Sequence, residues 1–92
     1  MQPFELDANL LLLLEPGRKN LRLVITDGHT EVACRKETRG NLHHFTTGEG
    51  DSLFKGRLRL HKSDGILTVV LNGSRVGSIP VNSFIYALDT LR

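Results

Sequence analysis

The sequence predicts a mainly β (β+α) fold, an antiparallel meander of six to seven strands that forms a curved sheet or small barrel, closed by a short C-terminal helix. Apolar and polar residues alternate over several short segments, which is the period of a strand. Turn dipeptides separate these segments, and Asp27-Gly28 and Asn72-Gly73 are typical of two-residue hairpins. The 92 residues, 39% of them hydrophobic and 24% charged, are expected to form one domain, 1–92.

The segment from Phe4 to Glu15 is compatible with a strand or a helix. Its leucine run favours a helix that Asp7 could cap, whereas Pro16 and Gly17 would end either structure. We favour a strand, because the alternating segment from Asn20 to Asp27 follows a turn and could pair with it. The run has no basic region before it and is far shorter than the ~20 residues of a membrane span. Neither a signal peptide nor a membrane span is therefore expected.

A hairpin is predicted at Asp27-Gly28, because a type I′ turn requires positive φ at both residues. This turn pairs Leu23 with Val32 and Leu21 with Cys34, which places the apolar residues of both strands on one face. Cys34 is therefore expected in the core. As the single cysteine it cannot form an internal disulfide, which favours a reducing, cytoplasmic location.

A polar crossing from Arg35 to Asn41 and a short strand from Leu42 to Thr47 are predicted next. The segment from Thr46 to Ser52 has the composition of a flexible loop. Neighbouring residues on a strand face opposite ways, so His43 and His44 are not expected to share a metal ion. No metal site and no cofactor are predicted.

The segment from Leu53 to Lys62 is predicted to be one strand that separates apolar from basic side chains. Phe54, Leu58 and Leu60 fall on one face. The other face carries the basic residues Lys55, Arg57, Arg59 and His61. A four-residue loop from Lys62 to Gly65 keeps the apolar face continuous into the next strand.

That loop pairs Leu60 with Leu67, whereas a three-residue loop would place charge on the apolar face. The turn at Asn72-Gly73 then pairs Val69 with Val76. It also pairs Val70 with Arg75.

A C-terminal helix is predicted after Pro80, which ends the last strand. Asn82 or Ser83 can cap this helix, and Arg92 suits its C-terminal dipole. Three apolar residues recur at helical spacing for packing on the sheet: Phe84, Leu88 and Leu91.

The order of elements from Leu53 to Arg92 resembles the strands-then-helix plan of PC4-type single-stranded DNA-binding domains. The whole chain is similar in plan to pleckstrin-homology domains. Both resemblances concern the outline of the fold and not a residue motif, so they assign no site residue.

The predicted registers gather cations on one sheet face, although the formal net charge is only +2. Arg57 and Arg75 share a cross-strand row, and Arg59 lies in the next. The face carries Lys55, Arg57, Arg59, His61 and Arg75. Cations spaced by about 4.8 Å between strands can meet successive phosphates. We therefore predict a small non-enzymatic module that binds nucleic acid, single-stranded rather than duplex.

Other interpretations remain open at this stage. The basic face could be the solvated side of a half-buried sheet, or it could bind an acidic protein or lipid. A protein-interaction or inhibitor module would use a sheet edge or an apolar patch, and an uncovered edge could pair with a second copy to form a homodimer. Phe45 and Tyr86 are the rings expected to be available for stacking on bases. No catalytic arrangement can be assembled, so no enzyme is predicted.

Overall fold

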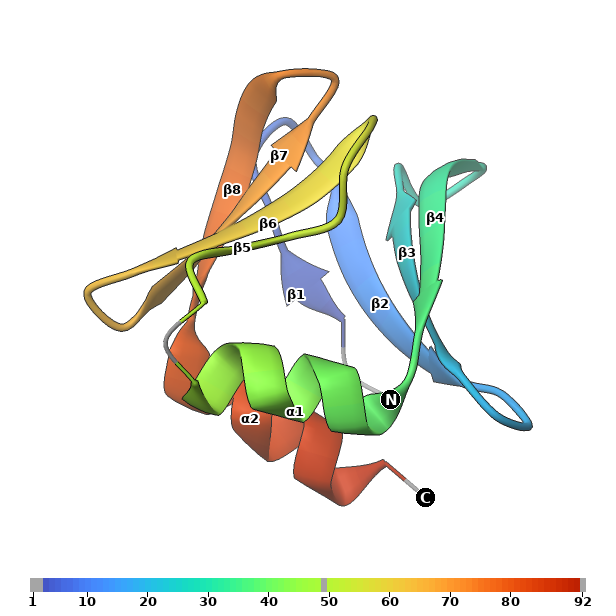
Figure 1. Ribbon diagram of the computed structural model, residues 1–92. Helices are drawn as coiled ribbons and strands as arrows, with labels where there is room; N and C mark the ends of the chain where they lie inside the picture. The colour runs from blue at the N-terminus through green and yellow to red at the C-terminus, as the bar shows by residue number, and fades with distance from the viewer. Residues whose placement is uncertain (1–2, 49, 92) are drawn as a thin grey trace.

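The computed structural model describes residues 3–48 and 50–91, which form two halves with the same order of elements (Figure 1). The first half contains β1 (Phe4–Glu5), β2 (Leu11–Pro16), β3 (Leu21–Thr26), β4 (Glu31–Glu37) and α1 (Arg39–Thr47). The second half contains β5 (Ser52–Leu53), β6 (Leu58–Ser63), β7 (Ile66–Leu71), β8 (Ser74–Pro80) and α2 (Val81–Thr90).

Each half forms its own antiparallel sheet, with strand order β1-β2-β3-β4 in the first sheet and β5-β6-β7-β8 in the second. Figure 1 shows the two sheets spreading apart above the two helices, which lie together at the base. The prediction of a mainly β protein with a C-terminal helix is confirmed. The prediction of one meander forming a curved sheet or small barrel is wrong, because α1 separates two four-stranded sheets that do not close.

The two halves also agree in detail. In both, the strands have 2, 6, 6 and 7 residues, and the helices have 9 and 10. The ladder between the last two strands contains a bulge in each half, at Val32 of β4 and Val76 of β8. The N–H of Asp7 donates to the carbonyl of Val76 at 2.7 Å. Reciprocally, Arg57 Nη2 donates to the carbonyl of Val32 at 3.5 Å.

The inner faces of the two sheets and one face of each helix share a single core. The buried leucines of β2 and β3 meet those of β6 and β7, and the core continues between α1 and α2. Its largest fully buried side chains are Phe84, Leu12, Leu14, Leu23, Ile25, Leu42, Leu58, Leu60, Leu67, Leu88 and Val69. Burial of these side chains is the main favourable contribution to folding.

The segment from Phe4 to Glu15 is extended, as favoured, but it is not one strand. Ala8 and Asn9 adopt positive φ values of 58° and 62°, which turns the chain between β1 and β2. Leu12 and Leu14 are fully buried while their neighbours in the run stay partly exposed, so the run is buried on one side only. Among the described residues, no helix is long and apolar enough to cross a membrane.

The first predicted hairpin forms with a different turn. Asp27 Oδ1 accepts two backbone N–H groups inside the loop at 2.8 Å, and the loop from 27 to 30 has four residues. Of the turn pair, only Gly28 adopts a positive φ, 94°, so the type I′ turn is absent. Cys34 consequently pairs with Val24 and not with Leu21. The prediction of Cys34 in the core is wrong, because it lies partly exposed on the outer face.

Helix α1 replaces the crossing predicted from Arg35 to Asn41 and the strand predicted from Leu42 to Thr47. The Thr38 side chain accepts the N–H of Asn41 at 3.1 Å and caps the helix. Leu42 and Phe45, three residues apart, are buried on the helix face that meets the core. This helix also departs from the all-strand order on which the pleckstrin-homology resemblance depended.

The strand predicted from Leu53 to Lys62 is a hairpin. β5 pairs with β6, and Leu53 lies opposite Leu60. Phe54 and Gly56 reverse the chain with φ values of 72° and 109°, which a non-glycine residue such as Phe54 rarely adopts. Two predicted site residues therefore lie in this turn and outside the strands: Lys55 and Arg57.

The loop from β6 to β7 has two residues and not the predicted four. Asp64 and Gly65 adopt φ values of 52° and 78°, as a type I′ turn requires. Leu60 therefore pairs with Val69 and not with Leu67, a shift of two residues that leaves the apolar face intact.

The turn at Asn72-Gly73 is confirmed, and Val70 lies opposite Arg75 as predicted. The pairing of Val69 with Val76 is wrong, because Val76 is the bulged residue and Val69 faces Gly77.

Helix α2 confirms the predicted C-terminal helix, but its start differs. It begins at Val81 directly after β8, so Pro80 occupies the capping position and neither Asn82 nor Ser83 does. The predicted apolar contacts are buried: Phe84, Leu88 and Leu91. Arg92 lies outside the described residues.

Candidate nucleic-acid interface

The outer face of the second sheet, the side away from the core, holds three of the five predicted site residues. Arg59 and His61 project from β6 and Arg75 from β8, and all three are exposed. Arg59, Val70 and Arg75 are cross-strand partners in one row, so their side chains leave the same face. The predicted row of Arg57 with Arg75 is wrong, because β6 begins one residue after Arg57.

The second row of this outer face is polar. His61 faces Thr68, and Thr68 faces Ser78. The face thus presents two guanidinium groups, one imidazole and two hydroxyl groups around the half-buried Val70. These groups can all donate hydrogen bonds to phosphate oxygens, the imidazole and the hydroxyls through one proton each.

The turn before β6 adds two further cations beside the Asn72-Gly73 turn. Arg57 Nε donates to Asn72 Oδ1 at 3.0 Å, and the N–H of Asn72 donates to the carbonyl of Arg57 at 2.7 Å. Arg59 Nε donates to the carbonyl of Gly56 at 3.1 Å. Lys55 is exposed in the same turn. These bonds fix the guanidinium groups close to the end of the row that Arg59 forms with Arg75.

The cations of this outer face have almost no acidic neighbours. The three strands β6, β7 and β8 contain no Asp or Glu. The carboxylate that reaches them comes from the first half: Asp7 Oδ2 accepts from Arg75 Nη1 at 2.9 Å. Arg75 Nη2 also donates to Ser78 Oγ at 3.2 Å.

Neither ring expected to be available for stacking lies on this face. Phe45 is buried in the core, 5% exposed, which contradicts the prediction. Tyr86 is 72% exposed, as predicted, but it belongs to α2 and not to the sheet. Phe54 is half-buried in the turn before β6, with the guanidinium of Arg35 4.8 Å from the ring centroid.

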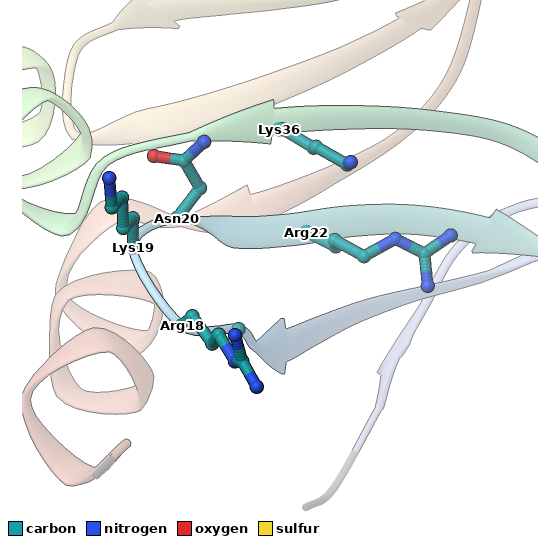
Figure 2. A pocket seen from close by; sticks show the side chains of 6 residues that line it. Arg18, Lys19, Asn20, Arg22 and Lys36 are labelled. Carbon is teal, nitrogen blue, oxygen red and sulfur yellow. The ribbon is translucent and has the colours of Figure 1, made fainter.

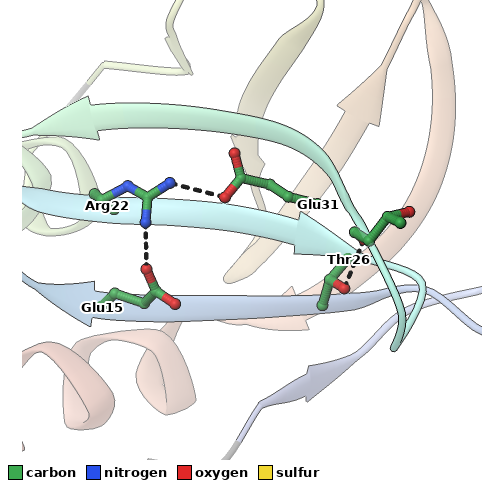
Figure 3. A network of polar contacts seen from close by, with 5 residues as sticks. Glu15, Arg22, Thr26 and Glu31 are labelled. Carbon is green, nitrogen blue, oxygen red and sulfur yellow. Dashed lines mark hydrogen bonds and ion pairs between the residues drawn. The ribbon is translucent and has the colours of Figure 1, made fainter.

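The outer face of the first sheet is organised in the opposite way. Figure 3 shows Arg22 of β3 between Glu15 of β2 and Glu31 of β4. Its two Nη atoms donate to these carboxylates at 2.7 and 2.8 Å. The hydrogen bond to Glu31 is the main reason that the pKa of Arg22 is raised. Val24, on the same face, is only 4% exposed, whereas Leu11 and Leu13 beside it are partly exposed.

The structure reveals one basic cluster that the sequence reasoning missed. A cavity of about 350 Å³ that is open to solvent lies at the turn between β2 and β3 and is lined by Gly17, Arg18, Lys19, Asn20, Arg22 and Lys36 (Figure 2). Arg22 and Lys36 are cross-strand partners. The register predicted for the first hairpin was wrong and did not pair these two residues. The correct register would have placed them side by side.

The histidines of α1 lie away from both outer faces. His43 Nε2 lies 4.0 Å from Asp89 Oδ1 of α2, at the contact between the helices. Within residues 3–48 and 50–91, no three His, Cys, Asp or Glu side chains group in a way that could hold a metal ion.

The two longest edge strands, β4 and β8, carry the bulges and the reciprocal contacts between the halves. Bulges and covering contacts are features that discourage edge pairing. Formation of a homodimer through an edge stays a prediction.

No family model, no curated protein and no solved structure matches this chain.

Proposed function

We propose that this protein binds single-stranded nucleic acid through the outer face of the second sheet and the turn before β6. The observation that carries the proposal is the row of Arg59, Val70 and Arg75 on strands that contain no acidic residue. The residues proposed to bind are Lys55, Arg57, Arg59, His61 and Arg75.

The spacing of these cations suits a flexible phosphodiester chain. β6 and β8 are two strand spacings apart, which separates Arg59 from Arg75 by about 10 Å at the backbone. The half-buried side chains of Val70 and Thr68 lie between them, where a sugar or a base could contact them. Because no aromatic ring lies on this face, phosphate contacts supply most of the affinity, and we expect strong salt dependence.

The ion pair between Asp7 and Arg75 does not prevent this role. Both side chains are more than half exposed, at 64% and 56%. Exposed pairs of this kind contribute about 0–1 kcal/mol, so a phosphate can replace the carboxylate at little cost.

The test is a titration of labelled single-stranded and duplex oligonucleotides by fluorescence anisotropy at several salt concentrations. Engagement of three or four phosphates predicts a slope of log affinity against log salt of roughly −2 to −3 on a single strand. Arg59→Gln combined with Arg75→Gln should weaken binding by about tenfold, since each exposed ionic contact contributes up to about 1 kcal/mol.

The matched control is Arg39→Gln, which removes an exposed cation at the start of α1. It should leave affinity nearly unchanged. If a single Arg59→Gln substitution weakens binding no more than Arg39→Gln does, the protein responds only to net charge and the proposed face is wrong.

A further inference from the structure

The cavity at the turn between β2 and β3 has features of a ligand site, and it uses no residue of the second half. Figure 2 shows the side chains of Arg18, Arg22 and Lys36 reaching out from the turn, from β3 and from β4. Lys19 and Asn20 extend from the same turn. Three separate segments therefore bring four cations around one cavity.

Half of this charge is not neutralised by the protein. In the described part of the chain, Arg22 forms ion pairs with Glu15 and Glu31. The same residues show no carboxylate within ion-pair distance of the other three cations of the cavity: Arg18, Lys19 and Lys36. Four positive and two negative groups leave a local charge of +2 (4 − 2), on a chain whose total formal charge is also +2.

The turn that carries two of these cations is built tightly. A Cβ atom placed on Gly17 would come within 2.6 Å of the carbonyl oxygen of Asn20, so only glycine fits this turn without a shift of the backbone. Pro16 fixes the preceding φ. The corresponding turn of the second half, Asp64-Gly65, has only two residues and carries no cation. The longer, basic turn therefore belongs to the first half.

We infer that this cavity binds a group of linked phosphates, such as a diphosphate or triphosphate. The cavity is open to solvent along its exposed lining, and its volume of about 350 Å³ exceeds the needs of one phosphate. Lysine and arginine around a multiply charged anion each replace part of its hydration. Glu15 and Glu31 offset the charge of Arg22, so the attraction for an anion comes from Arg18, Lys19 and Lys36.

The test is a titration of the ¹⁵N-labelled protein with inorganic pyrophosphate, followed by NMR at constant ionic strength. Saturable shifts are expected for the amide groups of Asn20, Arg22 and Lys36. Lys36→Gln combined with Arg18→Gln should raise Kd by about tenfold, because two exposed ionic contacts are lost. Arg59→Gln, on the other sheet, should leave Kd within about twofold, because exposed charges more than a Debye length apart are largely screened.

A second variant tests the geometry without changing the charge. Gly17→Ala should weaken pyrophosphate binding by distorting the turn, while its remaining amide spectrum should match that of the wild type. The inference is overturned if the shifts do not saturate, if chloride alone reproduces them, or if the double Gln variant binds equally well. An unchanged Kd for Gly17→Ala also contradicts it, because the turn would then not shape the site.

The source of the phosphates is distinguished by two further ligands. A nucleoside triphosphate should compete with pyrophosphate if the ligand is a free nucleotide. An oligonucleotide with a 5′-triphosphate should bind better than its 5′-hydroxyl counterpart if the ligand is the end of a nucleic acid, and Lys36→Gln should reduce that difference. If neither ligand competes with pyrophosphate, the inference of a linked-phosphate site is wrong. A weaker pyrophosphate affinity in the Lys36→Gln variant, with that of the Arg59→Gln variant unchanged, separates this site from the proposed sheet interface.

Discussion

The outer faces of the two sheets can be compared row by row, counting from the bulge in each half. The row of Leu11, Thr26 and Glu31 corresponds to that of Arg59, Val70 and Arg75. The next row of Leu13, Val24 and Cys34 corresponds to that of His61, Thr68 and Ser78. The same backbone positions are thus mainly apolar or acidic in one half and basic or polar in the other.

The inner rows differ much less. Leu12 and Ile25 of the first sheet correspond to Leu60 and Val69 of the second, and all four are fully buried. Conservation of volume at these positions is required by a close-packed core, whereas the outer positions carry no such requirement. The repeated plan therefore fixes the fold, and the divergent outer faces are where the two halves can differ in binding.

The largest expected effect on stability comes from truncating a buried leucine at equivalent inner positions of the two sheets. Leu12→Ala and Leu60→Ala each create a cavity at an equivalent, fully buried position, and each should lower the free energy of unfolding by about 2–5 kcal/mol. Urea denaturation measures both. A loss for one variant that is several times that of the other would show that the two halves do not share one core equally.

A smaller effect is expected where the inner rows differ in charge. Lys62 occupies the position equivalent to Leu14, and its Nζ donates to the carbonyls of Phe45, at 2.6 Å, and Gly48 at the end of α1. It also lies 5.4 Å from the Phe45 ring centroid. The second sheet thereby caps the helix of the first half.

Lys62→Met keeps the apolar part of this side chain and removes the charged donor. It should lower the free energy of unfolding by about 1–3 kcal/mol and speed amide hydrogen exchange in the last turn of α1. Lys55→Met, at an exposed position, is the control and should change stability little. Unchanged exchange in α1 would show that the cap does not hold the helix.

The charge difference between the two outer faces can be increased by removing the acidic residue that reaches the second sheet. Asp7→Asn frees Arg75 and should raise oligonucleotide affinity by about two- to fivefold, since an exposed pair contributes no more than about 1 kcal/mol. Glu15→Asn is the control, because it removes an acidic residue from the first sheet. An equal gain from both variants would indicate net charge as the cause.

Part of the fold could be predicted from local signals in the sequence. The strand around Leu23, the Asn72-Gly73 turn and helix α2 could be predicted because each depends on spacing or turn chemistry within a few residues. The face shared by Arg59, His61 and Arg75 also followed from alternation and the last hairpin.

The remaining features depend on interactions that the alternation does not encode. The first register is set by the bonds that Asp27 makes within its loop, and the turn before β6 depends on a positive φ at Phe54. Helix α1 has only Leu42 and Phe45 as apolar contacts, and its end is stabilised by Lys62 from the other half. The repetition of the same strand and helix order in the two halves was not predicted from the sequence, because the outer residues of the halves differ so strongly.

The last hairpin loop of each half can also be compared. Of these two loops, only that of the first half has a titratable side chain as its hydrogen-bond acceptor. The backbone N–H groups of Thr30 and His29 lower the pKa of Asp27 below its ordinary value of 3.8. A carboxyl group with a lower pKa in the folded state stabilises the protein above its unfolded pKa, and that stabilisation is lost as the pH falls through the folded value.

Asp27→Asn keeps an acceptor oxygen but removes the titration. The free energy of unfolding of the wild type minus that of this variant should therefore be constant near neutral pH and should decline below about pH 4. The equivalent turn of the second half, Asn72-Gly73, has no ionisable group, so Asn72→Ala should not alter the shape of this pH dependence. A difference that persists unchanged to the lowest pH at which the protein remains folded would mean that the Asp27 charge does not hold the first hairpin.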